Sequence, residues 1–480
     1  MLLQNLLEGI QEFQTTGQLR DVQIDNIQYD SRKVSAGCLF VCIEGFKVDG
    51  HNFINEAIAK GAAAVVVSKD VSIDGEVVLI KHPNTRKLLA ELSGRFYGNP
   101  TQKLNLIGVT GTKGKTTTTF MIKSILEHSG HKVGLIGTIA NYIGDKIIPA
   151  DRTTPESLEL QQMFSDMLDQ GVDTVVMEVS SHSLDLYRVY ACDFDVGVFT
   201  NLSQDHLDFH LNFDNYFAAK AKLFGMCRMA AINIDDSYGQ KLLNKCNCEI
   251  STIGINNDAD FSAYDIEIIP QGTSFNCKYG DKYYKVSIPI PGKFSVYNAL
   301  AAISSCSAYG VSKENIIGGL ENLKVPGRAE TVQTDRNFSV MVDYAHSPDS
   351  LENILQAVRV YAKGRVVVIF GCGGDRDRTK RPIMGEIAGK LAGFTIITSD
   401  NPRSEEPEAI IKEIEEGIKR TGSEYIIISD RRSAIEYCIK NAKENDIILI
   451  AGKGHETYQI FKDRTIHFDD REVAREALRI

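Results

Sequence analysis

Short apolar runs alternate with amphipathic stretches along most of the chain. The runs have the length of buried parallel strands, and helical patterns separate them. Such strands are predicted at residues 104–109, 133–136, 174–177 and 196–199, and again at 340–342, 365–370, 394–398, 424–428 and 446–450. The alternation predicts an α/β fold with two parallel sheets that carry helices on both faces.

Two stretches depart from this rhythm. The first hundred residues predict an amphipathic helix over residues 1–18, a β-rich stretch at 21–43, a helix at 54–61 and a strand at 63–67. Residues 258–290 include period-two alternation at 282–288, which predicts antiparallel strands. The break at Tyr97-Gly98-Asn99-Pro100 predicts a linker. A chain of 480 residues is expected to form about three domains.

A glycine-rich polar segment follows the strand at 104–109. It contains the candidate ATP-binding residues Gly111, Thr112, Lys113, Gly114, Lys115, Thr116 and Thr117. Glycines let backbone N–H groups approach phosphate oxygens, and a following helix points its positive end at the same anion. Lys115 is placed to reach the β- and γ-phosphates, and the Thr116 hydroxyl to bind Mg²⁺. A surface turn is the alternative, but the order of strand, loop and helix favours a phosphate-binding loop.

Polar residues follow two further strands in the same domain. Glu178 comes directly after the strand at 174–177, and the run Asp205-His206-Leu207-Asp208-Phe209-His210 follows the strand at 196–199. A carboxylate at a strand end near a phosphate loop is a candidate Mg²⁺ ligand. One such residue would usually be structural, whereas two clusters at the carboxyl ends of parallel strands favour a shared site.

The loop form T-G-T-K-G-K-T-T, in which Val109 replaces the usual first glycine, resembles the Mur ligase and folylpolyglutamate synthetase superfamily. These ATP-dependent enzymes join a carboxylate to an amine. Similar motifs continue in order through Val325-Pro326-Gly327-Arg328 and Val342-Asp343-Tyr344-Ala345-His346. The resemblance implies a UDP-sugar-binding domain at 1–102, a central P-loop domain at 103–327 and a Rossmann-like amino-acid-binding domain at 328–480.

The same resemblance implies the metal and nucleotide ligands. Thr116, Glu178 and His206 match Mg²⁺ ligands, and Asn298 matches an adenine contact. Lys220 matches a lysine that CO₂ carbamylates, so that it binds a second Mg²⁺. Read without the resemblance, the segment 216–224 is an amphipathic helix with two lysines facing solvent. Lys115, Lys220 and His206 are the expected catalytic residues.

Further matches concern the substrates, and they point to the branch of the family that adds the third amino acid of the peptidoglycan peptide. The resemblance implies that UDP-N-acetylmuramoyl-L-Ala-D-Glu contacts Ser31, Thr153, Thr154, Ser180 and Arg188. The incoming amino acid is expected at Arg376, Asp400, Asn401, Pro402, Arg403, Gly452 and Glu456.

Arg403 distinguishes between two amino acids. Arginine at this position resembles the pattern of the family members that add meso-diaminopimelate. The alternative is an enzyme that adds L-lysine. Diaminopimelate carries one carboxylate more than lysine, and a guanidinium binds a carboxylate through two hydrogen bonds. The implied reaction is ATP-dependent amide formation through an acyl phosphate. A P-loop binding switch would need no third domain, and folylpolyglutamate synthetase should lack the UDP-sugar domain.

The composition of the chain argues against several classes of partner. The net charge of −10 gives no electrostatic case for nucleic acid. The sequence has no apolar run of about 18 residues, so no membrane span is expected. The ten cysteines are scattered without zinc spacing, which is typical of reduced thiols in the cytoplasm. We expect a cytoplasmic monomer that uses ATP and Mg²⁺.

Overall fold

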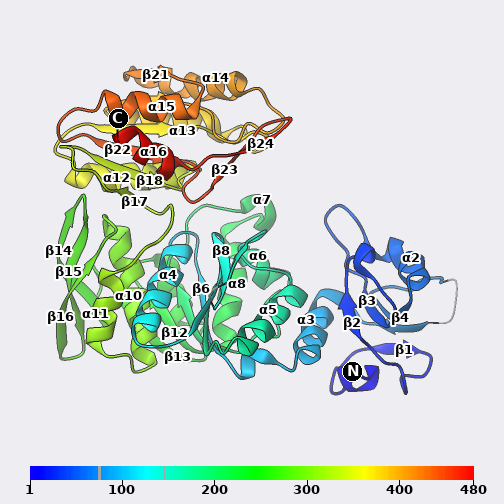
Figure 1. Ribbon diagram of the computed structural model, residues 1–480. Helices are drawn as coiled ribbons and strands as arrows, with labels where there is room; N and C mark the ends of the chain where they lie inside the picture. The colour runs from blue at the N-terminus through cyan, green and yellow to red at the C-terminus, as the bar shows by residue number, and fades with distance from the viewer. Residues whose placement is uncertain (74–76, 145, 480) are drawn as a thin grey trace. The chain divides into compact units, whose positions relative to one another are not determined.

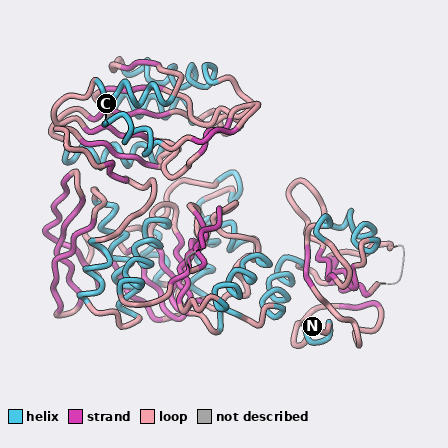
Figure 2. The backbone as a smooth tube through the Cα atoms, viewed as in Figure 1, coloured by secondary structure: helices cyan, strands magenta, loops and turns pink. Residues whose placement is uncertain are grey.

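The computed structural model describes residues 1–73, 77–144 and 146–479. Figures 1 and 2 show the helices and strands along the chain. The chain forms two compact units, Met1–Ile253 with Ser304–Gly310 and Gly254–Ile303 with Val311–Ile480. Parallel-rich sheets with helices occur in both units, so the predicted α/β class is confirmed. The three-domain boundaries at 102 and 327 stay a prediction.

The first unit begins with a five-stranded sheet in the order β1-β5-β4-β3-β2. Its elements are α1 (Leu3–Leu7), β1 (Gln14–Thr16), β2 (Asn26–Gln28), η1 (Ser31–Lys33), β3 (Cys38–Val41), η2 (Gly50–Phe53), α2 (Ile54–Ala59), β4 (Ala62–Val67), β5 (Val78–Lys81), α3 (Thr85–Phe96) and η3 (Pro100–Gln102). The predicted helix over residues 1–18 is wrong beyond Leu7. Gly9 adopts a positive φ of 70°, and Gln14–Thr16 pairs antiparallel with β5 instead.

A larger sheet of the first unit has the strand order β13-β12-β11-β6-β10-β7-β8-β9. The strands are β6 (Asn105–Thr110), β7 (Val133–Ile136), β8 (Ala140–Ile143), β9 (Lys146–Pro149), β10 (Thr174–Glu178), β11 (Phe194–Phe199), β12 (Cys227–Asn233) and β13 (Glu249–Gly254). The helices are α4 (Lys115–His128), α5 (Ser157–Asp169), α6 (Ser181–Asp185), α7 (Leu207–His210), α8 (Phe213–Ala221), η4 (Lys222–Gly225) and α9 (Ser237–Leu243). The four strands predicted between residues 104 and 199 are confirmed.

Register brings three strand ends of this sheet together. β6 lies between β10 and β11 and runs parallel to both. Glu178 pairs with Val109, and Phe199 pairs with Thr110. The loops that follow β6, β10 and β11 therefore leave the sheet at the same edge, where ligands bind in open α/β sheets.

The second unit contains an antiparallel group and a doubly wound sheet. β14 (Phe261–Ile269), β15 (Gly272–Tyr279) and β16 (Lys282–Ile288) pair antiparallel, as the alternation predicted. The second sheet has the order β17-β18-β22-β19-β20-β21, with β17 antiparallel and the others parallel. Its strands are β17 (Glu330–Val332), β18 (Ser339–Asp343), β19 (Val366–Phe370), β20 (Phe394–Ile397), β21 (Tyr425–Ile427) and β22 (Ile447–Ala451). The five strands predicted here are confirmed.

Local sequence explains where several helices of the second unit begin. The helices are α10 (Lys293–Ala308), whose residues from Ser304 on belong to the first unit, α11 (Lys313–Glu321), α12 (Pro348–Tyr361), α13 (Lys380–Leu391), α14 (Pro407–Ile418), η5 (Lys419–Thr421), α15 (Arg431–Lys440) and α16 (Asp470–Arg479), with a hairpin of β23 (Tyr458–Ile460) and β24 (Thr465–His467). Ser347 caps α12 through a capping box, and Pro348 occupies its first turn. Across the described ranges, no helix has both the length and the apolar content needed to cross a bilayer.

Candidate active site

The phosphate-loop candidate lies between β6 and α4. The strand ends at Thr110 and the helix begins at Lys115, so Gly111–Gly114 forms the turn. Gly111 has a φ of 146°, and a Cβ there would lie 1.9 Å from Thr200 Oγ1. Only glycine fits this close approach. The turn leads directly into the first turn of α4, whose positive end is where a phosphate would bind.

The segment after β11 braces this loop. The Thr112 N–H donates to Asn201 O, and the Lys113 N–H donates to Asn201 Oδ1, both at 2.9 Å. In return, Thr200 Oγ1 donates to Lys113 O at 2.7 Å. Sequence reasoning did not assign Asn201 a role. Its position directly after the strand at 196–199 was the available signal.

Two lysine side chains converge on the loop. Lys115 Nζ donates to Gly111 O at 2.9 Å and to Thr112 O at 3.0 Å, and Lys220 Nζ donates to Gly111 O at 2.8 Å. Burial, together with the charge of Lys115, lowers the pKa of Lys220 well below its usual value. Of the two lysines predicted on one helix, Lys220 is buried, and only Lys222 is exposed, paired with Asp185. Burial therefore favours the neutral amine form of Lys220.

Glu178 lies buried at the end of β10. Its Oε1 accepts hydrogen bonds from Thr116 Oγ1 and from the Thr138 N–H, both at 2.9 Å. Its Oε2 accepts from Thr138 Oγ1 at 3.1 Å. The carboxylate and the Thr116 hydroxyl therefore lie side by side at the first turn of α4. Thr138 was not predicted, because it lies in a loop with no motif.

His206 directly precedes α7 and has a φ of 53°, and its side chain is half-exposed. Its ring lies 4.9 Å from the ring of His182, and burial lowers the pKa of His206. Within the described ranges, no hydrogen bond or ion pair joins His206 to Glu178. The two residues lie at the same edge of the sheet, Glu178 at the end of β10 and His206 after β11, with β6 between these strands.

The predicted donor set fits a nucleotide-borne magnesium ion better than a free-standing metal site. In the described part of the chain, no group of three or more His, Cys, Asp or Glu side chains could hold a metal ion. The predicted set contains only two such side chains, Glu178 and His206, plus the hydroxyl of Thr116 and the expected carbamate on Lys220. Mg²⁺ is usually held by one or two carboxylates together with waters and substrate phosphates, so this sparse set is adequate beside a triphosphate.

Four of the predicted sugar-nucleotide residues gather beside Glu178. Thr154 Oγ1 donates to the Glu178 backbone oxygen at 2.8 Å, and the Ser180 N–H donates to Thr154 Oγ1 at 3.2 Å. Arg188 Nη1 donates to Thr154 O at 3.1 Å. Thr153 Oγ1 lies 3.0 Å from Thr138 Oγ1, which itself contacts Glu178. These side chains therefore adjoin the candidate metal ligand.

Ser31 lies in a separate cluster. Its hydroxyl donates to Glu56 Oε2 at 3.3 Å, and its backbone oxygen accepts from Lys60 Nζ at 2.9 Å. No contact in the described ranges links Ser31 to the four residues above. Asn298 lies buried in the second turn of α10, within the second compact unit.

The predicted amino-acid-binding residues form a network at the carboxyl ends of β20 and β22. Asn401 Nδ2 donates to Glu456 Oε2 at 2.8 Å, and a Cβ on Gly452 would lie 2.7 Å from Asp400 Oδ2. Arg403 Nη1 donates to Gly374 O at 2.8 Å. Pro402 is buried, whereas Arg376 is exposed on the loop after β19.

Two buried cations that sequence reasoning missed support this network. Lys453 Nζ donates to Glu456 Oε2 and Asn401 Oδ1. Arg431 forms a fully buried pair with Asp470, and it also donates to Ser399 O and Ala451 O. These two carbonyls precede Asp400 and Gly452. Lys453 stood inside the quoted Gly452–Glu456 motif, but nothing in the sequence indicated its partners.

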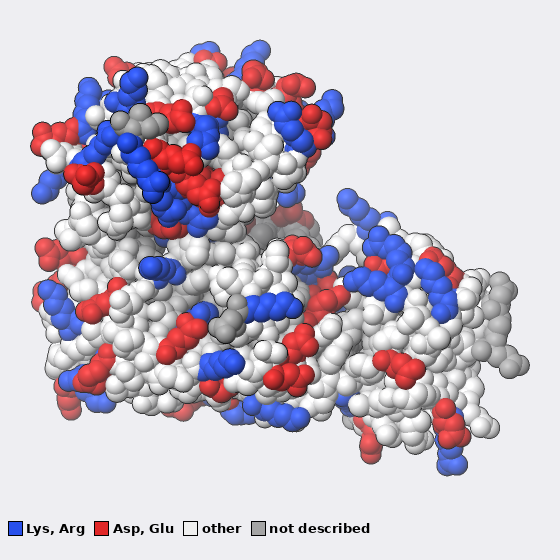
Figure 3. Space-filling view, in the orientation of Figure 1, with Lys and Arg blue, Asp and Glu red and all other residues white. Residues whose placement is uncertain are grey.

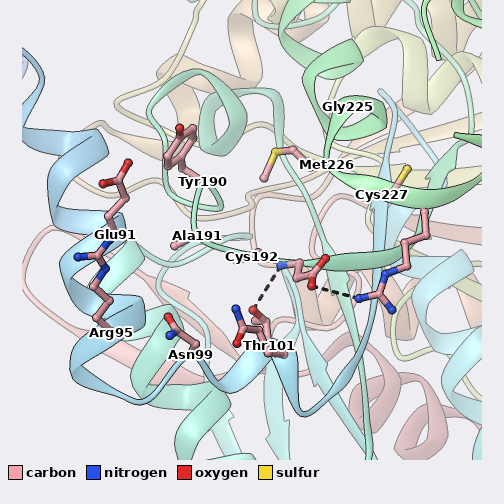
Figure 4. A pocket seen from close by; sticks show the side chains of 13 residues that line it. Glu91, Arg95, Asn99, Thr101, Tyr190, Ala191, Cys192, Gly225, Met226 and Cys227 are labelled. Carbon is pink, nitrogen blue, oxygen red and sulfur yellow. Dashed lines mark hydrogen bonds and ion pairs between the residues drawn. The ribbon is translucent and has the colours of Figure 1, made fainter. Parts of the chain in front are cut away.

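A cavity of about 580 Å³ lies away from these strand ends (Figure 4). Its lining includes Thr101, Asp193 and Arg228, which lie before or at the starts of β6, β11 and β12. Asp193 accepts from Arg228 there at 3.1 Å. Ligands of open α/β sheets bind at the opposite ends of the strands, so this cavity is not the candidate site.

Comparison with known proteins identifies the family. The Mur ligase family catalytic domain matches residues 23–97, the Mur ligase middle domain matches 109–306, and the Mur ligase glutamate ligase domain matches 327–454. A protein of Caldanaerobacter subterraneus subsp. tengcongensis is 50% identical over 479 residues, covering 100% of this chain and 99% of the relative. The chain belongs to the Mur ligase family. The resemblance inferred from the motifs is thus confirmed.

Similar Mur ligases carry a common name. The Caldanaerobacter protein is named UDP-N-acetylmuramoyl-L-alanyl-D-glutamate–2,6-diaminopimelate ligase. A Clostridium acetobutylicum protein with the same name, numbered 1, is 52% identical and covers 96% of this chain and 95% of its own length. A solved structure of a ligase with that name has a TM-score of 0.75 and 32% identity, covering 100% of this chain and 99% of that one.

Proposed function

We propose that this Mur ligase uses ATP to join meso-diaminopimelate to the γ-carboxylate of UDP-N-acetylmuramoyl-L-Ala-D-Glu in peptidoglycan precursor synthesis. The observation that carries the proposal is the similarity of about 50% over the full length to ligases named for this reaction. Arg403 supports the choice of amino acid, because its guanidinium suits the additional carboxylate of diaminopimelate.

The residues at the carboxyl edge of the central sheet suit acyl-phosphate chemistry. The γ-carboxylate attacks the γ-phosphate of ATP, ADP leaves, and the amine of diaminopimelate then displaces phosphate from the acyl phosphate. Lys115 and the positive end of α4 would offset the clustered negative charge. No protein nucleophile is needed. Catalysis rests on positioning the reactants and on fixed charges around them.

The ligand assignments form part of this proposal. Thr116, Glu178 and His206 would hold Mg²⁺, which neutralises phosphate charge when bound. Asn298 would contact adenine. Ser31, Thr153, Thr154, Ser180 and Arg188 would bind the UDP-sugar peptide. Asp400, Asn401, Pro402, Gly452, Glu456 and Arg376 would bind diaminopimelate together with Arg403.

Lys220 is proposed to react with CO₂ and to become a carbamate. The amine nitrogen forms a bond to carbon and releases one proton, so that a neutral group becomes an anion. The burial of Lys220 and its lowered pKa support this reaction, because only the neutral amine is nucleophilic. The resulting carboxylate analogue would bind a second Mg²⁺. We further propose that the protein acts as a monomer in the cytoplasm.

Phosphate release tests the function. The full-length protein should release phosphate from ATP when UDP-N-acetylmuramoyl-L-Ala-D-Glu and meso-diaminopimelate are both present. Release with L-lysine in place of diaminopimelate would favour the lysine-adding alternative. Phosphate release from ATP in the absence of both the UDP-sugar peptide and the amino acid would favour a P-loop binding switch. Release in none of these mixtures would contradict the proposed activity.

A further inference from the structure

Lys453 is a cation with no exposed surface, and no predicted role accounts for it. It follows β22 between Gly452 and Gly454, and its side chain is 0% exposed. Its Nζ donates to Glu456 Oε2 at 2.9 Å, to Asn401 Oδ1 at 3.3 Å and to Tyr458 O at 2.5 Å. An ammonium has three N–H donors, so all of them are engaged. Lys453 therefore has no donor left for a substrate.

The ammonium of Lys453 sets the orientation of Asn401. Asn401 Oδ1 faces two donors, Lys453 Nζ and the Ile460 N–H at 3.0 Å. The amide nitrogen must then point the other way, and it donates to Glu456 Oε2 at 2.8 Å. Two donors thus converge on a single oxygen of Glu456.

The other oxygen of Glu456 remains available. Among the residues that the structure describes, none donates a hydrogen bond to Glu456 Oε1. An ionised carboxylate only accepts, so this oxygen suits an ammonium group. Arg403 lies two residues after Asn401, and its backbone N–H donates to Ile460 O at 3.0 Å, so its segment is joined to the residue whose N–H contacts Asn401 Oδ1. An acceptor and a guanidinium in one place match the ammonium and carboxylate of an amino-acid end group.

We propose that Lys453 is a positioning residue that turns Glu456 so that Oε1 receives the far ammonium of the diamino acid, while Arg403 receives the far carboxylate. This inference rests on the proposed function and deepens it. The far end of the diamino acid is then recognised by two independent groups, the Glu456 carboxylate for its ammonium and the Arg403 guanidinium for its carboxylate. Lys453 acts through Glu456 and Asn401, and Arg403 acts through its own guanidinium.

Two substrate analogues separate these parts. L-2-Aminopimelate keeps the far carboxylate and lacks the far ammonium, whereas L-lysine keeps the far ammonium and lacks the carboxylate. The experiment compares kcat/KM for meso-diaminopimelate with kcat/KM for each analogue, in the unaltered protein and in Lys453→Met. The substitution should lower the preference over aminopimelate at least about 10-fold and leave the preference over lysine within about 3-fold, since a lost charge-assisted hydrogen bond has that order of effect.

The control is Lys419→Met. It removes a lysine that pairs with Glu415 at the same distance of 2.9 Å on the surface of the same compact unit. Both preferences should be unchanged in this variant. A general loosening of the site in Lys453→Met would lower both preferences together, and an unchanged preference over aminopimelate would equally overturn the proposal.

Two further substitutions of Lys453 cover the case in which Lys453→Met does not fold. Lys453→Gln removes the charge but retains N–H donors, and it should shift the aminopimelate preference in the same direction. If Lys453→Met, Lys453→Gln and Lys453→Arg all fail to fold, Lys453 is a residue of the fold and the proposal is wrong. If the unaltered protein does not turn over diaminopimelate at all, the proposed function fails instead.

Discussion

At the scale of the residue, burial decides the chemical state of several side chains. Lys220 and Lys222 lie two positions apart, yet Lys220 is buried and donates to Gly111 O, whereas Lys222 is exposed and pairs with Asp185. Desolvation disfavours the charged form of a lysine, so only the buried one is suited to react with CO₂. The sequence pattern alone placed both on a solvated face.

Lys220→Ala should lower the rate of phosphate release about 100-fold or more, because it removes the proposed carbamate charge from the site. A short carboxylic acid such as acetate should restore part of the rate. Lys222→Ala provides the matched control and should behave like the unaltered protein. A normal rate for Lys220→Ala would contradict the carbamate role, since the buried amine would then be dispensable.

His455 should contribute to loss of stability in acid. Burial lowers the pKa of His455 to about 3, whereas the unfolded value is about 6.5. Protonation therefore favours the unfolded chain. The contribution is fully present above about pH 6.5 and is lost as the pH falls through the folded pKa, by at most about 1.4 kcal/mol per pH unit.

Melting temperatures measured between about pH 7 and pH 4 check this point. The melting temperature of His455→Gln should fall less steeply with decreasing pH than that of the unaltered protein. His128→Gln, which changes an exposed residue at a helix end, should behave like the unaltered protein. Parallel curves for all three proteins would show that His455 does not cause the acid loss.

At the scale of the element, the loop between β6 and α4 depends on close backbone packing. Besides the 1.9 Å approach to Thr200 Oγ1, a Cβ on Gly111 would lie 3.1 Å from both Asn201 N and Asn201 O. The loop is thus fitted against the segment after β11. A change in one loop must displace the other.

Gly111→Ala should abolish measurable ATP use, and Thr200→Ala in the same chain should not restore it, because the Asn201 backbone still obstructs the Cβ. Gly130→Ala is the matched control. Gly130 also has a positive φ, of 95°, but no atom lies within 4 Å of the added Cβ. It should cost about 1–2 kcal/mol of stability and leave ATP use intact. Restored activity in the double variant would show that Thr200 alone imposes the constraint.

Elements with strong local signals could be predicted from the sequence. Apolar runs predicted the strands. The polar and glycine-rich segments that follow them predicted that Gly111, Glu178 and His206 lie at the ends of neighbouring strands. The first helix was wrong beyond Leu7, because Gln14–Thr16 pairs with a strand more than sixty residues away. Lys453 was missed for the same reason, since Asn401 lies 52 positions from it. Long-range partners leave no local pattern.

At the scale of the whole molecule, the chain divides into two compact units and carries a net charge of −10. Figure 3 shows basic and acidic side chains interspersed over much of one face. Like net charges repel one another and oppose self-association.

Sedimentation should therefore give a mass near 53.1 kDa that does not change with protein concentration. The measurement should be repeated at high salt, which screens the net charge. A mass that doubles as concentration rises would contradict the monomer.

The buried Arg431–Asp470 pair has a consequence for the order of events during synthesis. The two residues lie 39 positions apart, and Arg431 also holds the carbonyls of Ser399 and Ala451. A ribosome that adds about 5–20 residues per second takes roughly 2–8 seconds to make Asp470 after Arg431. During that interval the guanidinium lacks the carboxylate with which it forms its buried ion pair. The loops that it braces should therefore stay open on the ribosome and close only after Asp470 has emerged.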